Sequence, residues 1–487
     1  MKRNYYHLVF YYYGFFLVLI GLIQLLPLIN LIFYPNESNL LYCFLIPSII
    51  AIATGIIIRG LLKDTKIIKL EKGYDSLLLV LIWLSAIIIS TIPWLLKGGY
   101  NFTQACFEMT SGFSTTGLSI VDVGNTPKTF LVFRSITLFV GGVGFVLIVT
   151  SAFSDRYGLN LYNAEGHNDR LMPNLVRSSR LILSIYSIYI VLGALAYIFF
   201  GMPVFDAINT SIAALSTGGF SVIDESIYGY HSLPIEIVTT ILMLLGQTNF
   251  VLHLKMLNLK FKDIYNHCET KLLIFLFVVL VALMTNNLIQ YNYTNDILQS
   301  LRLSIFQFVT CITTTGFISV ESLNALPSGF ITMMILLMLV GGNQESTGGG
   351  IKQYRIIVTL KGIYYSIKEL LLNNQAITSR RIWRYGKNSE LTDNEIQSTS
   401  SYVLFYLILF FLGSTIFTLY GYSLQDSMFE FSSAISTVGL SVGITNYYAS
   451  KVVLWTAIIG MFLGRLEIMV IFKAILRVTR DFKNKEF

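Results

Sequence analysis

The sequence predicts an all-α integral membrane protein in which two extra N-terminal helices precede four repeated helix–loop–helix units. Hydrophobic residues make up 54% of the 487 residues, and charged residues make up only 13%. The apolar residues form long uninterrupted stretches, whereas a soluble helical protein arranges them in stripes. A short glycine-containing motif also recurs four times between these stretches, which indicates an internal repeat.

Ten apolar stretches reach the length of about 20 residues that a helix needs to cross a bilayer. They lie at 8–33, 40–62, 75–96, 128–153, 181–201, 232–254, 271–290, 326–367, 400–421 and 450–476. An even number of spans places both termini on one side of the membrane. The first stretch is longer than the apolar core of a signal peptide and lacks a small-residue cleavage site, so we expect it to remain as a helix.

Lysine and arginine are concentrated in alternate loops. One side of the expected topology carries Arg59, Lys63, Lys66, Lys69, Lys72, Arg156, Arg170, Arg177, Arg180, Lys255, Lys260, Lys262, the cluster at 380–387, Arg477, Arg480, Lys483 and Lys485. The other side carries mainly Lys97, Lys128 and Lys451. This bias predicts that both termini are cytoplasmic. It also accounts for the net charge of +7, so we expect no nucleic-acid partner.

The chain lacks the common sequence patterns of a metal centre or an enzyme. Its four cysteines show no CxxC spacing, and its five histidines show no HExxH motif. The ionisable residues expected at membrane depth are Glu345, Arg465 and Glu467, and such residues usually belong to ion pathways or relays. The sequence therefore predicts no enzyme activity, no catalytic residue and no organic cofactor.

The repeated motif is a half-apolar stretch that ends in a threonine- and glycine-rich turn. Its copies are CFEMTSGFSTTGLSIVD (106–122), FDAINTSIAALSTGGFSVID (205–224), FQFVTCITTTGFISVE (306–321) and FEFSSAISTVGLSVGI (429–444). They align on Gly117, Gly219, Gly316 and Gly439. Ten positions earlier stand Phe107, Asn209, Phe306 and Phe429, and an acid or amide follows each phenylalanine: Glu108, Gln307 and Glu430. This agreement indicates one structural unit that is used four times.

Each motif is apolar for about 12 residues, which is too short to cross a bilayer but long enough for a half-helix that enters and returns. Non-helical backbone at membrane depth is tolerated only where protein buries it or where it lines a water-filled cavity. The predicted fold is therefore four helix–pore loop–helix repeats around one pore, after the two N-terminal helices. The predicted segments are an N-terminal extension (1–70), pore repeats 1 (71–155), 2 (175–257) and 3 (268–370), a cytoplasmic loop (371–399) and pore repeat 4 (400–487).

The motif glycines allow the backbone to approach the pore axis in conformations that other residues avoid. Rings of carbonyl oxygens can then replace the hydration shell of a cation, and the half-helices direct the negative ends of their dipoles at the same point. The predicted filter residues are Thr116, Gly117, Gly218, Gly219, Thr315, Gly316, Val438 and Gly439. The predicted cation ligands are the backbone carbonyls of Thr115, Thr116, Thr217, Gly218, Thr314, Thr315, Thr437 and Val438.

The apolar segment 326–367 is longer than one span, but glycines interrupt it. They are Gly341, Gly342, Gly348, Gly349 and Gly350. About ten residues are therefore expected to leave helical geometry within the membrane, which requires that they are buried or line the pore. We predict that 341–350 is a movable gate below the filter, with the glycines as hinges, and that motion of a cytoplasmic partner reaches it through the following helix.

Two ionisable residues are assigned to the same gate. Arg465 lies within the apolar run WTAIIGMFLGRLEIMVIF, where a charge costs about 2.5–3.5 kcal/mol unless it faces a polar cavity or a partner. We expect Arg465 below the filter as a barrier to cations, and we expect Glu345 beside it. The two side chains could form an ion pair. Alternatively, Glu345 is solvated or protonated, and Arg465 binds Glu467 or backbone carbonyls.

Together these motifs resemble the Trk/Ktr/HKT superfamily of potassium transporters, and its TrkH branch in particular. The resemblance covers nearly the whole chain and includes the two additional N-terminal spans. It rests on FEMTSGFSTTG (107–117), GGVGF (141–145), YNAEG (162–166), LMPNLVRSSRLI (171–182), STGGFS (216–221), GQTNF (246–250), TTTGF (313–317), STGGGIK (346–352) and GRLEIM (464–469). The segment before STGGGIK departs from the family, because it is usually small and neutral but here contains Asn343, Gln344 and Glu345.

The resemblance implies K⁺ uptake across a bacterial-type cytoplasmic membrane through a gated, K⁺-selective pore. It also implies a homodimer with one pore per subunit, embedded in lipid and regulated by a cytoplasmic ring of TrkA-like nucleotide-binding subunits. STGGGIK lacks the spacing of a phosphate-binding loop, so the chain itself is not expected to bind a nucleotide. K⁺ is expected over Na⁺ because Gly117 stands where family members that admit Na⁺ often carry serine.

Two alternatives remain at this stage. A secondary transporter that binds its substrate between broken helices would also show repeats, but inverted repeats come in pairs, whereas these four copies run in parallel. Within the channel-like class, the protein could be Na⁺-permeable or could couple K⁺ transport to another ion.

Overall fold

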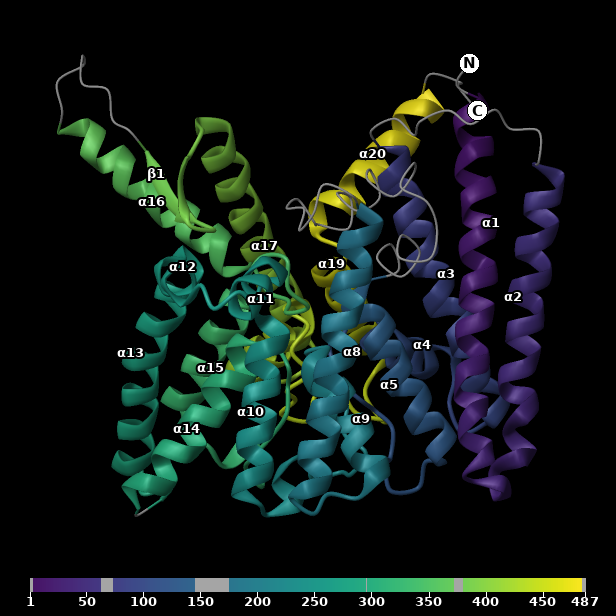
Figure 1. Cartoon of the computed structure of the whole chain (residues 1–487), viewed down its shortest axis with the longest axis horizontal. Helices are drawn as coiled ribbons and strands as arrows, with labels where there is room; N and C mark the ends of the chain where they lie inside the picture. Colours follow the sequence, from purple (N-terminus) through teal and green to yellow (C-terminus); the bar gives the residue numbers. More distant parts are fainter. Residues whose placement is uncertain (1–2, 63–72, 145–174, 295, 372–379, 484–487) are drawn as a thin grey trace.

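The computed structural model describes residues 3–62, 73–144, 175–294, 296–371 and 380–483. Within these ranges the regular structure is helical apart from one two-stranded sheet. Helix α1 (Arg3–Leu25) begins and α20 (Ile468–Lys483) ends on the same side of the molecule, at the top of Figure 1. This side is called the termini face, and the opposite side the far face. The YNAEG motif and the expected segment boundaries at 70 and 155 lie outside the described residues.

Six described helical segments are long and apolar enough to cross a membrane. They are Tyr5–Ile32, Pro35–Leu61, Tyr74–Lys97, Arg177–Phe199, Cys268–Gln290 and Asp393–Leu419. A bent pair of helices, Leu233–Gln247 and Phe250–Leu257, adds a seventh if its two parts count as one span. The all-α membrane architecture expected from the sequence is confirmed, but the ten apolar stretches are not ten continuous helices.

In chain order the described elements are grouped into an N-terminal pair and four units, numbered 1 to 4. The pair contains α1, η1 (Leu26–Ile32), η2 (Pro35–Leu40) and α2 (Leu41–Leu61). Unit 1 contains α3 (Tyr74–Lys97), α4 (Phe102–Phe113) and α5 (Lys128–Val143). Unit 2 contains α8 (Leu175–Phe199), α9 (Val204–Leu215), η3 (Tyr228–Tyr230), α10 (Leu233–Gln247), α11 (Phe250–Leu257) and α12 (Phe261–Asn266).

Units 3 and 4 repeat this order. Unit 3 contains α13 (Cys268–Gln290), α14 (Ile297–Ile312), η4 (Leu323–Ala325), α15 (Ser328–Val340) and α16 (Gln353–Leu370). Unit 4 contains α17 (Asp393–Leu419), α18 (Leu424–Ile435), α19 (Lys451–Arg465) and α20. In units 2, 3 and 4 the second long helix is broken, which is why these stretches did not form continuous spans.

The N-terminal pair packs through small residues. A Cβ added to Gly14 would lie 2.9 Å from the carbonyl oxygen of Gly55, so the backbones of α1 and α2 are in direct contact. Such close approach is the usual basis of helix association in a bilayer, where burial of apolar surface gives no driving force. Gln24 of α1 then donates a hydrogen bond to Ser90 of α3 at 2.6 Å, which fixes the pair to unit 1.

Three of the four short helices, α4, α9 and α18 but not α14, end where a glycine of the second long helix of their unit approaches closely. A Cβ on Gly141, Gly246 or Gly464 would lie less than 3.0 Å from the last carbonyl of α4, α9 or α18, respectively. Any larger residue at these three positions would push the end of the short helix away. The glycines therefore position the motif that follows each of these three short helices.

The termini face carries a β-hairpin that rests on α16 (Figure 1). Its strands, β1 (Arg381–Arg384) and β2 (Lys387–Glu390), are antiparallel. The two turn residues, Tyr385 and Gly386, have φ of 51° and 84°, as a tight two-residue hairpin requires. Ile382 of β1 is buried in a small cluster with Tyr354, Val358 and Leu391, so the hairpin has its own anchor on α16.

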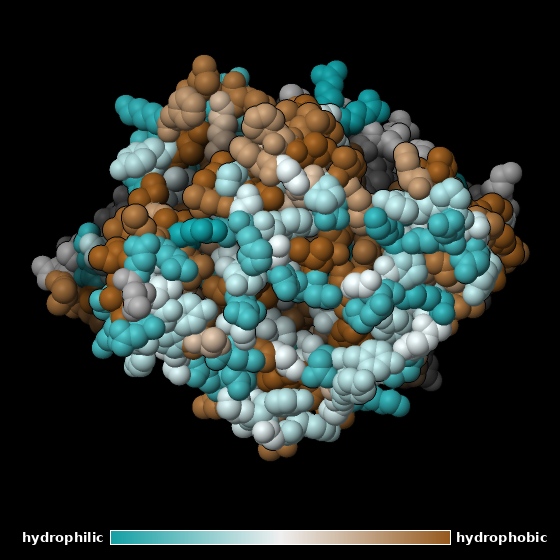
Figure 2. Space-filling model, turned by 90° about the horizontal axis from the view of Figure 1, so that it is seen from below, coloured by the Kyte–Doolittle hydropathy of each residue, from teal (hydrophilic) through white to brown (hydrophobic). Residues whose placement is uncertain are grey.

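The far face has a different character. Figure 2 shows hydrophilic residues across the middle of this face and hydrophobic residues toward its margins. That distribution fits a protein whose edge meets lipid and whose centre meets water.

Candidate functional site

The four aligned motifs share one backbone conformation. The threonine two positions before each motif glycine has φ between 50° and 56°, and the glycine has φ between 60° and 99°. These threonines are Thr115, Thr217, Thr314 and Thr437. Non-glycine residues rarely adopt the left-handed region because the Cβ atom is crowded there, so the same strain at four equivalent positions points to a functional constraint.

The amide groups of the motifs all turn toward their own short helix. The N–H groups of the residues between threonine and glycine donate to carbonyls five residues earlier, at 2.8 to 3.0 Å. The pairs are Thr116 with Ser111, Gly218 with Ala213, Thr315 with Thr310, and Val438 with Ser433. In a trans peptide the carbonyl points opposite to the N–H. The carbonyls of the four left-handed threonines therefore point away from the short helices.

The motifs contact one another in a closed ring. A Cβ added to any motif glycine would lie less than 3.0 Å from a motif carbonyl oxygen of another unit. The pairs are Gly117 with Gly218, Gly219 with Thr315, Gly316 with Val438, and Gly439 with Thr116. Each unit thus faces the next one in the chain, and unit 4 returns to unit 1. All eight predicted filter residues take part in this ring.

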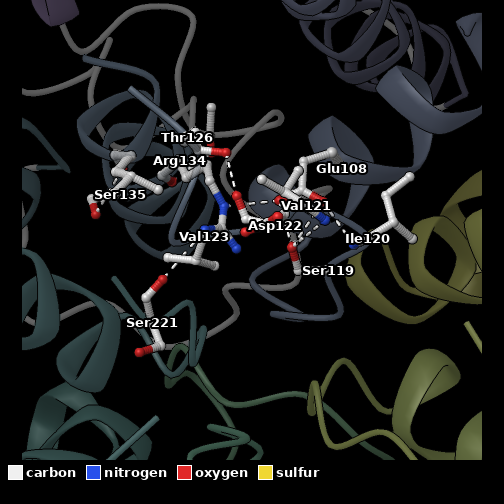
Figure 3. Close-up of polar contacts among 12 residues, drawn as sticks. Glu108, Ser119, Ile120, Val121, Asp122, Val123, Thr126, Arg134, Ser135 and Ser221 are labelled. Carbon is white, nitrogen blue, oxygen red and sulfur yellow. Dashed lines mark hydrogen bonds and ion pairs between the residues drawn. The ribbon is translucent and has the colours of Figure 1, made fainter. Parts of the chain in front are cut away.

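In units 1 and 4, a buried acid behind the ring holds the segment that leaves the motif. Glu108 of α4 accepts hydrogen bonds from the hydroxyl of Ser119 at 3.0 Å and from the amide of Ile120 at 3.3 Å (Figure 3). Glu430 of α18 accepts equivalent bonds from the hydroxyl of Ser441 at 2.7 Å and from the amide of Val442 at 2.9 Å. These carboxylates therefore fix the residues that directly follow the motif in units 1 and 4.

Arg134 of α5 connects units 1 and 2 at this level. Its guanidinium pairs with Glu108 at 2.8 Å, donates to the carbonyl of Ser221 at 3.3 Å and lies 4.0 Å from the ring centre of Phe220 (Figure 3). The Arg134 and Glu108 side chains are 2% and 1% exposed, so both charges depend on this pairing. An ion pair this deeply buried is costly to break.

Replacing Arg134 by alanine is expected to destabilise the protein by about 3–5 kcal/mol, because the Glu108 carboxylate would stay buried without its cation. Thermal unfolding in detergent measures this effect. The matched control is Arg380→Ala, because Arg380 also pairs with a glutamate, Glu369, at 2.6 Å, but these side chains are 21% and 39% exposed. That variant should lose at most about 1 kcal/mol. Equal losses in the two variants would contradict the assigned role.

The loop between α15 and α16 lies directly against the ring, on the side that faces the termini face. It doubles back on itself, with the amide of Gly342 donating to the carbonyl of Gly349 at 3.2 Å. Gly341 and Gly350 have φ of 72° and 76°, and a Cβ on Gly341 would lie 2.7 Å from Gly350 Cα. The amide of Gly349 donates to the hydroxyl of Thr314 at 2.6 Å, which connects the loop to the ring in unit 3.

The tip of the loop also contacts units 2 and 4. The hydroxyl of Thr347 donates to the carbonyl of Gly246 at 2.8 Å, and Tyr186 donates to the same hydroxyl at 3.2 Å. A Cβ on Gly349 would lie less than 3.0 Å from the carbonyl oxygen of Ser436. Gly348 packs beside it, with its added Cβ 3.2 Å from the carbonyl oxygen of Thr313.

Arg465, at the end of α19, joins the loop to unit 1. Its guanidinium donates to the carbonyl of Thr347 at 3.1 Å, to that of Gly142 at 3.1 Å and to that of Gly141. Among the partners considered for Arg465, the structure therefore shows the backbone carbonyls. Glu467 binds Arg355 at 2.8 Å. Glu345 is 5% exposed and has φ of 57°, and its pairing with Arg465 stays a prediction.

A cavity of about 50 Å³ lies beside the loop, which forms part of its wall. Its charged lining residues are Glu345, Lys352, Arg355, Arg465 and Glu467. By this measure one water needs about 10–15 Å³, so the cavity holds at most a few waters. The space below the ring is thus narrow and carries more positive than negative side chains.

Comparison with known proteins identifies the family. The sequence profile of TrkH, described as a cation transport protein, matches residues 44–480. The chain belongs to the TrkH family. The expected family membership is therefore confirmed, and since members of this family are transporters, so is the expectation that the chain is not an enzyme.

Three similar proteins cover almost all of this TrkH-family chain. An uncharacterized cation transporter of Methanocaldococcus jannaschii is 30% identical over 93% of this chain and 91% of its own length. The Trk system potassium uptake protein TrkG of Escherichia coli is 28% identical over 96% of this chain and 97% of its own. The crystal structure of the potassium transporter TrkH from Vibrio parahaemolyticus matches with a TM-score of 0.83 at 22% identity, over 98% of both chains. It shares the fold.

Several functional residues of this TrkH-family chain were missed from the sequence. Arg134 lies in the run KTFLVFRSITLFVGG, and an arginine inside an apolar stretch is a signal that could have revealed it. Glu108 and Glu430 stand out in the sequence as part of the motif, but their role becomes visible only in the folded chain. From the sequence we expected only Glu345, Arg465 and Glu467 as ionisable residues at this depth. The structure adds Arg134, Glu108 and Glu430.

Proposed function

We propose that this chain takes up K⁺ through a pore formed by its four units, with the ring of motifs as the selectivity filter. The observation that carries the proposal is the closed cycle of glycine–carbonyl contacts, since it brings backbone carbonyls from four segments around one axis. The names of the relatives agree with this assignment, because several are Trk system potassium uptake proteins.

The filter would bind K⁺ through the eight carbonyls predicted from the sequence, two from each unit. The left-handed threonines direct one carbonyl of each unit away from its short helix. The dipoles of α4, α9, α14 and α18 place partial negative charge at the same centre. Buried Glu108 and Glu430 keep the carbonyls in place, so the ring does not collapse around a smaller ion.

The loop 341–350 would act as the gate, and Arg465 as its positive barrier. The loop contacts units 2, 3 and 4 directly and reaches unit 1 through Arg465. The narrow cavity below it corresponds to a closed state. Conduction then requires that the loop leaves its position beneath the filter.

The termini face would be cytoplasmic in a bacterial-type inner membrane, as the distribution of lysine and arginine predicts. On this assignment the described part of α16 and the hairpin project toward the cytoplasm, where a TrkA-like nucleotide-binding ring would bind. The functional unit would be a homodimer with one pore in each subunit. The far face would then be the entrance for K⁺.

Ion flux into proteoliposomes tests the assignment. The purified chain should carry K⁺ and Rb⁺ and should carry Na⁺ much more slowly. Equal fluxes of K⁺ and Na⁺ would favour the Na⁺-permeable alternative, and K⁺ flux that requires a gradient of a second ion would favour a coupled transporter. The control is the variant with 343–347 deleted, which removes the centre of the gate and should increase K⁺ flux.

Acidic residues beyond the filter should speed K⁺ entry. Asp122, Asp224 and Glu321 each stand five positions after a motif glycine, and all three are exposed. Replacing them together by Asn, Asn and Gln should lower K⁺ influx several-fold at low ionic strength, because negative charge at an entrance concentrates cations. At about 1 M ionic strength the Debye length falls to about 3 Å, so the difference should disappear. A defect of the same size at both ionic strengths would contradict steering.

A further inference from the structure

The β-hairpin on the termini face reaches the gating loop through one residue, Gln344. Arg384, at the end of β1, donates to the side-chain oxygen of Gln344 at 3.3 Å. The next residue, Tyr385, accepts a hydrogen bond from the side-chain amide of Asn249 at 2.9 Å. The same amide donates to the backbone carbonyl of Gln344 at 2.6 Å. The hairpin turn is therefore connected to the loop on two separate paths, one through a single hydrogen bond and one through the side chain of Asn249.

Gln344 is held on its remaining side as well. Its backbone N–H donates to the carboxylate of Glu269 at 2.7 Å, and Glu269 is fully buried at the start of α13. Side chain, carbonyl and amide of this one loop residue are thus each bound by a different element. Of these three elements, the hairpin reaches farthest toward the termini face, at the top of Figure 1.

The hairpin is also coupled to α16, the helix that follows the loop. The Arg384 guanidinium lies 4.2 Å from the ring centre of Tyr354 in α16 and 4.8 Å from that of Tyr385. Tyr385 packs on His267, with ring centres 5.1 Å apart. A displacement of α16 or of the hairpin would therefore move Arg384 relative to Gln344.

We propose that Arg384 and Tyr385 are positioning residues that hold the gating loop in its closed place, and that a displacement of the hairpin releases the loop. This inference rests on the proposed function of 341–350 as a gate. The physical reason is that a guanidinium–amide hydrogen bond in a partly buried site is directional and is lost with a small movement. Sequence patterns do not reveal it, because Arg384 falls in a short basic cluster that resembles an ordinary cytoplasmic loop.

The test measures loop exposure separately from flux. Ser346, in the loop, is 8% exposed and lines the cavity below the filter. In a Cys268→Ala background, Ser346→Cys provides a thiol for a membrane-impermeant maleimide, since the other three cysteines are buried. Adding Arg384→Ala should increase the labelling rate about tenfold, because a hydrogen bond to a charged group shifts an equilibrium by roughly that factor. K⁺ flux should increase in parallel.

Two further variants keep the result interpretable. Arg381→Ala is the matched control, because Arg381 lies on the same strand with an exposed side chain, and it should label at the unmodified rate. Tyr385→Phe removes only one hydroxyl, so it should fold even if Arg384→Ala does not, and it should also label faster. Labelling of both hairpin variants at the Arg381→Ala rate would overturn the inference. Faster labelling with no K⁺ flux in any variant would instead reject the proposed pore while leaving the positioning role intact.

Discussion

Replacing Gly117 by serine is expected to lower the ratio of K⁺ to Na⁺ flux about tenfold or more. Gly117 has φ of 89°, and its added Cβ would lie less than 3.0 Å from the carbonyl oxygen of Gly218. The contact between units 1 and 2 would have to open, and the strain of about 1–3 kcal/mol would displace carbonyls from the positions that suit K⁺. Flux of ⁸⁶Rb⁺ and ²²Na⁺ in proteoliposomes measures the ratio.

Gly443→Ser is the matched control for this experiment. Gly443 follows the unit 4 motif and has a similar φ of 97°, but nothing lies within 4 Å of the Cβ that serine would add. The two variants therefore carry comparable backbone strain and differ in contact with the ring. If Gly443→Ser lowered the flux ratio as much as Gly117→Ser, backbone strain rather than ring geometry would explain the effect.

Arg465→Ala is expected to raise K⁺ flux about tenfold. A unit charge about 10 Å from an ion in the pathway raises the energy of that ion by roughly 1.7 kcal/mol at an effective dielectric constant of about 20. Removing the charge therefore lowers the barrier by that amount, which corresponds to roughly a ten- to twentyfold increase in rate. The variant also loses the hydrogen bond between α19 and the loop at Thr347. Unchanged or reduced flux in a folded variant would count against the barrier.

Arg465→Lys separates the two contributions of this residue. Lysine keeps the positive charge but cannot reproduce the planar fork that binds carbonyls of Thr347, Gly141 and Gly142 at once. Flux close to that of the unmodified chain would assign the effect to charge. Flux close to that of Arg465→Ala would assign it to the connection between the loop and unit 1.

The fold class could be predicted from the sequence because it depends on short-range patterns, whereas the role of the ring as a filter stays a prediction. Apolar length indicates a membrane helix directly, and the motif glycines at one register identified the residues that approach each other. The breaks were harder to predict. Residues such as Asn249 and Glu467, which stand at the helix breaks, are common at helix ends of any kind, so only tertiary contacts show that α10 and α19 stop there.

The partners of residues that act across units could not be predicted from a single sequence. Arg134 binds Glu108 from its own unit and Ser221 from the next, and this partnership depends on how the units pack. Arg384 and Gln344 are 40 positions apart and lie in elements without a shared motif. In both cases the chemistry of the side chain allows many partners, and only the fold selects one.

The ring of motifs is built from four different segments of one polypeptide, unlike the pore of a symmetric tetramer. A substitution in a symmetric tetramer appears four times at once, whereas here it appears once. The ring already uses this freedom, because its middle positions are Thr116, Gly218, Thr315 and Val438. A graded series with one, two, three or four altered positions can therefore be made within a single gene, and the stoichiometry of every ring is then fixed by covalent connection.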